Sequence, residues 1–157
     1  MKEKQYFEIE QSELTFGLLS EQKPEIVQGG VGILILPSSP QHEAFYSGTI
    51  ELFEYMRENS SDGTVEIFST DEEYKELAQH SADFWIGTFF VGSIFVPLLV
   101  NLLSSYIFEK LKAKDGDTLS VNVIVEKSKG KSVSINFRGD AKDFPAVIES
   151  IRKLSDE

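Results

Sequence analysis

The chain has 157 residues, 41% apolar and 26% charged, so it is long enough for one folded domain and too apolar for a disordered chain. It contains no cysteine, which excludes disulfides, thiol nucleophiles and cysteine-ligated metal sites. The net charge of -11 argues against binding nucleic acid through phosphate contacts. It is compatible with a basic protein partner, or with high solubility alone.

The charge is unevenly distributed along the chain. Residues 1–83 hold 17 acidic and 5 basic side chains, a balance of -12, whereas residues 109–157 hold 9 and 10, a balance of +1. Residues 84–108 between them carry no charge. We therefore divide the chain into an acidic α/β segment up to residue 83, an apolar helical segment (84–114) and a ββα tail (115–157), expected to pack as one compact domain.

The acidic segment has the pattern of strands around a helix. Residues 6–10 alternate, residues 14–19 are a candidate second strand, and residues 31–36, VGILIL, are typical of a buried strand. Apolar positions of residues 40–58 fall on one helical face, and residues 64–68 predict another strand. The order strand–helix–strand predicts a crossover and a parallel pair.

A second helix is expected before the apolar segment. Thr70 and Glu73 have the spacing of a capping box, and Tyr74, Leu77 and Ala78 would form the buried side of the helix that it begins. This helix would lead directly into the apolar run.

The longest uncharged stretch is FWIGTFFVGSIFVPLLVNLLSSYIF, residues 84–108. Its length is typical of a membrane span. However, Pro97 would break a helix near its middle, and no secretory signal precedes the acidic segment that a span would have to export. We therefore favour a long apolar helix that is buried in protein and broken near Pro97, and keep a bilayer-inserted helix as the alternative.

The apolar run also supplies a candidate interface. A chain this small cannot easily cover so apolar a helix on all sides. Aromatic side chains concentrate interface energy, and small or polar side chains three or four residues apart permit close helix contact. The predicted interface residues are Trp85, Phe89, Phe90, Ser93, Phe95, Pro97, Asn101, Ser104 and Ser105.

After the apolar segment, the sequence predicts two strands and a helix. Residues 119–125 alternate, residues 127–131 (KSKGK) form a hairpin loop, and residues 133–137 return. Asp143 then begins a helix with one apolar face. The whole chain is thus predicted to be α+β: a small sheet with a βα crossover, a long apolar helix broken near Pro97, and a C-terminal ββα unit.

Candidate catalytic and metal-binding residues are few. Ser39 and His42 are close in sequence, but no acid partner or oxyanion hole is evident, so Ser39 is interpreted as a helix cap. Glu76, His80 and Asp83 share one face of a predicted helix, and we interpret them as a surface ion-pair group rather than metal ligands. We expect no enzymatic activity, no cofactor and no metal.

The stretches HSADFW…VPLLVNLLSSYIFEKLK and AKDFPAVIESIRKL complete a layout of small α/β segment, apolar helix and ββα tail. This layout resembles the effector-associated constant component modules of bacterial conflict systems, and the first stretch resembles small uncharacterised bacterial proteins. The resemblance implies a non-enzymatic coupling part of a defence system and no particular site residues. The chain differs from those modules by its longer apolar run and its more acidic N-terminal segment.

The sequence therefore predicts a cytoplasmic, non-catalytic interaction or assembly module that self-associates, or binds a partner protein, through the apolar helix. One alternative is a membrane-associated effector that inserts residues 84–108. Another is an acidic inhibitor of a basic nucleic-acid-binding protein. Direct contact with nucleic acid is not expected.

Overall fold

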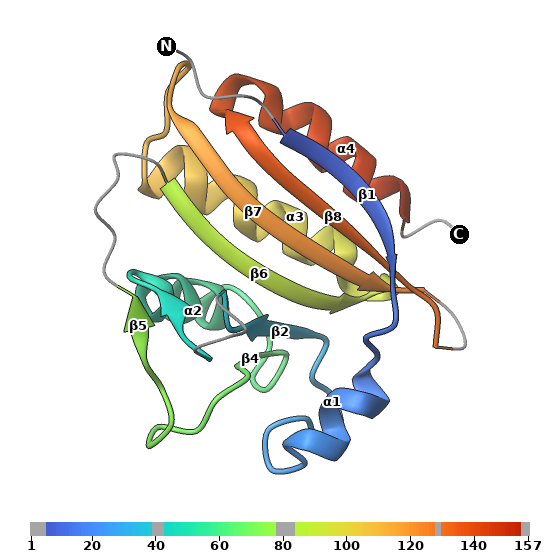
Figure 1. Cartoon of the computed structure of the whole chain (residues 1–157). Coiled ribbons are helices and arrows are strands. Elements are labelled where there is room, and N and C mark those ends of the chain that lie inside the picture. Colours follow the sequence, from blue (N-terminus) through green and yellow to red (C-terminus); the bar gives the residue numbers. More distant parts are fainter. Residues whose placement is uncertain (1–5, 39–42, 78–83, 128–129, 155–157) are drawn as a thin grey trace.

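The computed structural model describes residues 6–38, 43–77, 84–127 and 130–154 (Figure 1). Its centre is a mixed sheet of six strands in the order β1-β8-β7-β6-β2-β4. The strands are β1 (Tyr6–Ser12), β2 (Ile33–Leu36), β4 (Val65–Ile67), β6 (Phe84–Gly92), β7 (Thr118–Glu126) and β8 (Ser132–Asp140). Two short strands, β3 (Phe45–Tyr46) and β5 (Glu76–Leu77), pair separately. The chain is α+β, as predicted.

The sheet mixes both kinds of pairing. β1, β8 and β7 are antiparallel neighbours, and β6 joins β7 in parallel. β2 is antiparallel to β6 and parallel to β4, which confirms the predicted parallel pair of the first half. Strands from all three sequence segments therefore lie in one sheet.

Four α-helices accompany the sheet in the described residues: α1 (Phe16–Gln22), α2 (Thr49–Glu58), α3 (Val96–Ser105) and α4 (Phe144–Lys153). Three short turns adjoin them: η1 (Ser93–Phe95) and η3 (Ala141–Asp143) are 3₁₀, and η2 (Tyr106–Lys110) is π-helical. Figure 1 shows α3 and α4 behind the long strands, and the two helices pack against each other. We call the face of the sheet that they cover the helix-covered face.

The main core lies between the sheet and these helices. Leu119, Val121, Val123 and Val125 occupy alternate positions of β7 and are buried against the helices, because successive side chains of a strand point to opposite faces. Phe137 of β8 and the apolar faces of α3 and α4 complete this core. The predicted ββα tail is confirmed in both strands and in its helix.

A second, smaller core lies on the other face, under α1. It contains Leu19 of α1, Leu34 and Leu36 of β2, Phe68, Phe90 and Ile124. The ring of Phe16 meets the ring of Phe90 edge-on at 4.7 Å. Two hydrogen bonds fix the start of α1: Thr15 Oγ1 accepts from Leu18 N, and Glu126 Oε1 accepts from Phe16 N. The predicted strand at 14–19 was therefore wrong, because a capped helix begins there.

The apolar run is divided between a strand and a helix. The predicted long apolar helix is present over Ser93–Lys110, and Pro97 lies in the first turn of α3, where η1 gives way to the α-helix. The start of the predicted helix is corrected, since residues 84–92 form β6 between β7 and β2. This strand is apolar on both sides: Phe89 faces the main core and Phe90 the smaller one.

Two other helix predictions need correction. α2 begins at Thr49, because Phe45 and Tyr46 already form β3. The predicted helix after Thr70 does not form in residues 70–77. The capping-box hydrogen bonds between Thr70 and Glu73 are made, but they close a turn that leads into β5. Residues 78–83 lie outside the described part of the chain.

Candidate functional site

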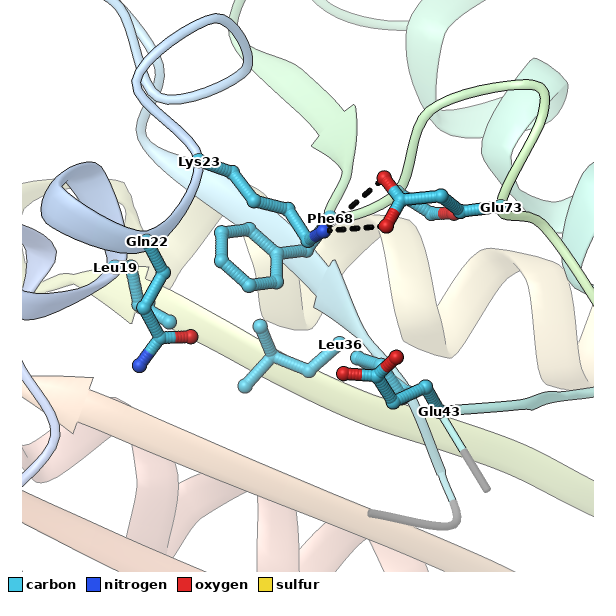
Figure 2. Close-up of a pocket in the computed structure, with 9 residues that line it drawn as sticks. Leu19, Gln22, Lys23, Leu36, Glu43, Phe68 and Glu73 are labelled. Carbon is cyan, nitrogen blue, oxygen red and sulfur yellow. Dashed lines mark hydrogen bonds and ion pairs between the residues drawn. The ribbon is translucent and has the colours of Figure 1, made fainter. Parts of the chain in front are cut away.

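A half-open pocket of about 240 Å³ lies where the parallel strands β2 and β4 end (Figure 2). The carboxyl ends of parallel strands meet at one edge of a sheet, which is a frequent location of ligand sites. Leu36 and Phe68 form its apolar floor together with Leu19 of α1. The other lining residues are Gln22, Lys23, Pro37, Glu43, Ser69 and Glu73.

An ion pair closes one side of this pocket. Lys23 Nζ lies 3.2 Å from both carboxylate oxygens of Glu73 and 5.7 Å from the centre of the Phe68 ring. The Thr70 hydroxyl donates to Glu73 Oε1 at 2.8 Å. These hydrogen bonds hold the pKa of Glu73 below its ordinary value. The bond from Thr70 has the largest effect, and the bond from Lys23 has the next largest. In Figure 2 the Glu43 carboxylate lies apart from this pair, beside Leu36.

The described lining of the pocket combines an apolar floor with polar and charged groups. Ser69 supplies the hydroxyl of this lining, and none of the described lining residues is a histidine that could activate it. Its two carboxylates, Glu43 and Glu73, are both exposed, and Glu73 is paired with Lys23. The arrangement therefore suits a small group with an apolar body and a polar end.

Of the candidate catalytic and metal-binding residues, Glu76 alone lies in the described part of the chain. Ser39, His42, His80 and Asp83 lie outside the described residues. Glu76 is in β5 rather than on a helix, and its Oε2 accepts a hydrogen bond from the Tyr74 hydroxyl at 2.7 Å. Within the described ranges, no group of three or more His, Asp or Glu side chains could hold a metal ion.

The nine predicted interface residues are dispersed. Phe89 and Phe90 are fully buried in the fold, so neither is available to a partner. Pro97 and Asn101 are exposed on the outer side of α3. The remaining five are half-buried: Trp85, Ser93, Phe95, Ser104 and Ser105. Ile94, which the sequence analysis did not single out, is 82% exposed.

The helix Ser93–Lys110 is the one helix of the described residues that is long and apolar enough to cross a membrane by length and composition. In the fold its residues Val96, Leu99, Val100 and Leu103 are part of the main core. A core helix of a soluble protein passes the same test, so this helix is compatible with either setting.

The face of the sheet opposite α3 and α4 is a polar surface built from regular structure. Figure 1 shows that no helix lies over the viewer's side of β6, β7 and β8, apart from α1 near the ends of these strands. Pairing across the strands sets the side chains in rows: Trp85, Ser120 and Arg138 form one row, and Thr88, Asn122, Asn136 and Glu8 the next. We call these residues, with Ser134 and Glu10, the open face.

An aromatic and arginine cluster marks one end of the open face. The Trp85 ring meets the Tyr46 ring edge-on at 4.9 Å, and the Arg138 guanidinium lies 5.5 Å from the centre of the Trp85 ring. Burial raises the pKa of the Tyr46 hydroxyl, and the positive charge of Arg138 opposes that shift. The Trp85 Nε1 atom is buried and has no hydrogen-bond partner among the described residues.

The side chains in the middle of the open face are short and uncharged. The Ser134 hydroxyl donates to Asn122 Oδ1 at 3.0 Å, and both residues are half-buried between neighbouring strands. The alternation of β7 and β8 identifies these positions as one side of a hairpin. The sequence did not reveal that Trp85 joins them, because this depends on the parallel register of β6 with β7.

Comparison with protein-family models, curated proteins and solved structures gives no match for this chain.

Proposed function

We propose that the chain is a non-catalytic module that binds a basic protein through the open face. The observation that carries this proposal is the composition of that face. Serine, asparagine and threonine fill its middle, and Tyr46, Trp85 and Arg138 gather at one end. The same residue types dominate the binding surfaces of antibodies, where Trp and Arg supply the energetic anchors.

Side-chain conformational entropy, as well as residue chemistry, favours binding at the open face. Short side chains lose little rotamer freedom on binding, and long lysine or glutamate side chains lose much more. On the open-face side of β7 and β8, positions 120, 122, 134 and 136 are all Ser or Asn. The ring of Trp85 contacts both Tyr46 and Arg138, which restrict its orientation before a partner arrives.

Charge supports a basic partner. The chain carries a net charge of -11, which attracts cationic proteins and accelerates their association at low salt. Glu8 and Glu10 lie at the β1 rim of the open face, where partly solvated charges steer binding.

The apolar helix has a smaller part in the proposed binding than the sequence predicted. Its apolar side belongs to the core, and its exposed remainder near Ile94, Pro97 and Asn101 is small. A part in a bacterial defence system, and action in the cytoplasm, stay predictions from the sequence, and the binding proposal requires neither.

Matched arginine substitutions test the proposal. Asn122→Arg adds a long cation to the middle of the open face, whereas Ala146→Arg adds the same group to the exposed side of α4 on the other side of the sheet. A partner captured with the wild-type chain is identified, purified and titrated against all three proteins. We expect a basic protein whose Kd rises at least tenfold for Asn122→Arg and stays unchanged for Ala146→Arg.

Two outcomes would contradict the proposal. One is equal affinity of both variants for the partner. The other is a bound protein without excess positive charge, whose affinity is independent of salt. Circular dichroism of both variants establishes that each is folded.

A further inference from the structure

The outer edge of β1 is the longest free edge of the main sheet. β1 pairs with β8 over seven residues, and no other described strand lies on its far side. β4, at the opposite edge, has only three residues. Backbone N–H and C=O groups of an edge strand point away from the sheet at alternate residues, so they form a template for one further strand.

The side chains of β1 alternate between apolar and acidic. Phe7 and Ile9 pair with core residues of β8 and lie on the helix-covered side, yet they are 42% and 55% exposed. They are two of the five large apolar side chains exposed in the described residues. Glu8 and Glu10 lie on the open-face side. A strand laid along β1 would therefore meet an apolar row on one side and an acidic row on the other.

A second copy of the chain is a poor occupant of this edge. Antiparallel self-pairing that sets Ile9 opposite Ile9 also sets Glu8 opposite Glu10 of the other copy. Self-pairing that sets Ile9 opposite Phe7 sets Glu8 opposite Glu8. Like charges directly opposite each other destabilise a strand pair, so the acidic row works against self-pairing.

We propose that β1 accepts an extended segment of a partner protein in which basic and apolar residues alternate. The basic side chains would pair with Glu8 and Glu10, and the apolar ones would cover Phe7 and Ile9. Backbone hydrogen bonds to the edge would supply affinity, and the alternation would supply specificity. This inference rests on the proposed function in one respect, namely that the partner is a basic protein.

The size of the open face also favours an additional contact. At about 4.8 Å between strands and about 3.4 Å per residue, four strands and three rows give an area of roughly 300–400 Å². A stable interface buries about 800 Å² on each partner. A partner of the open face must therefore reach beyond it, and β1 forms its rim.

Two labelled peptides test the inference. One is a nine-residue peptide of alternating lysine and valine, and the other has the same composition with its lysines adjacent. Fluorescence anisotropy measures their binding to the full chain at low salt. We expect the alternating peptide to bind at least tenfold more tightly, because only it can place lysine and valine on separate sides of β1.

A charge exchange locates the binding. The double variant Glu8→Lys with Glu10→Lys is expected to lose the lysine–valine peptide and to bind an alternating glutamate–valine peptide instead. The control Glu54→Lys with Glu58→Lys makes the same charge change on the exposed side of α2 and should keep the original preference. Circular dichroism confirms that both double variants are folded.

Equal binding of the two lysine–valine peptides, or an equal loss in both double variants, would overturn the inference in favour of diffuse electrostatic attraction. No binding of either peptide would also overturn it. If the wild-type chain is a dimer and Ile9→Lys makes it a monomer, the edge of β1 is assigned to a second copy instead. Binding of a partner across the middle of the open face is tested separately by the Asn122→Arg variant.

Discussion

The two faces of the hairpin β7–β8 differ completely, although they are made from alternate residues of the same two strands. On the helix-covered face, Val121, Val123 and Phe137 are buried in the main core. On the open face their immediate neighbours Asn122 and Asn136 are half-buried and polar. Core residues and open-face residues therefore alternate along one stretch, so changes in adjacent residues should have different consequences for stability.

Aspartate substitutions at two adjacent residues should show the largest difference in stability between the two faces. Val123→Asp puts a carboxylate without a partner into the main core, at a cost on the order of 5 kcal/mol, so we expect little or no folded protein. Asn122→Asp keeps the oxygen that accepts from the Ser134 hydroxyl and should change the free energy of unfolding by less than about 1 kcal/mol. Urea denaturation followed by circular dichroism measures both, and similar stabilities would contradict the assignment of faces.

The next prediction concerns the part of the open side that α1 covers. Phe90→Ala should lower the free energy of unfolding by about 3–5 kcal/mol, because its ring is fully buried between Phe16 and β2. Thr88→Ala, two residues earlier on the same side of β6, should cost less than about 1 kcal/mol. Thermal unfolding of the pair determines where the smaller core ends, and equal losses would show that it extends over the open face.

A smaller effect is expected from two serines of β8. The buried Ser132 hydroxyl donates to the Leu14 carbonyl oxygen at 2.6 Å, so Ser132→Ala leaves that oxygen without this donor and should cost about 1–3 kcal/mol. Ser134→Ala removes a hydroxyl that is half-buried, and water can replace its contact, so it should cost less than about 1 kcal/mol. Urea midpoints distinguish the two, and a larger loss for Ser134→Ala would be the contrary result.

The smallest effect is electrostatic and lies at the pocket. The pKa of Glu73 is lowered in the folded chain, so its ion pair contributes stability above the ordinary value of 4.5. That contribution is lost as the pH falls through the lower pKa of the folded state. The stability difference between wild type and Glu73→Gln should be constant near neutral pH and shrink toward zero in acid. Glu72→Gln, at the exposed neighbouring position, is the control, and an equal pH trend for both would remove the ion pair as its cause.

The sequence predicted those elements whose period was uninterrupted. The tail was correct because β7 alternates over residues 118–123 and α4 keeps one apolar face. Residues 84–92 were assigned to a helix because β6 is buried on both sides, and a strand of this kind has no alternation to distinguish it from a buried helix. α1 was missed because its seven residues are too few for a clear helical period.

The candidate site was harder to predict than the fold. Trp85 and Arg138 are far apart in sequence and become neighbours only through the pairing of β6 with β7 and of β7 with β8. The predicted interface assumed that an apolar run must remain uncovered. The fold instead uses that run twice, as a central strand and as a core helix, and leaves Ile94 as its most exposed apolar side chain.

A single additional residue sets the phase of β6. The pairing with β7 skips Ile86, and Gly87 follows with a φ of 138°, a conformation that favours glycine. Because of this bulge, Trp85 and Thr88 point to the same side although they are three residues apart. A regular strand that kept Ile86 in the pairing would instead turn the indole toward the helices and Ile86 toward the open face. The presence of Trp85 on the open face thus depends on a bulge at one point of β6 rather than on the alternation of the strand.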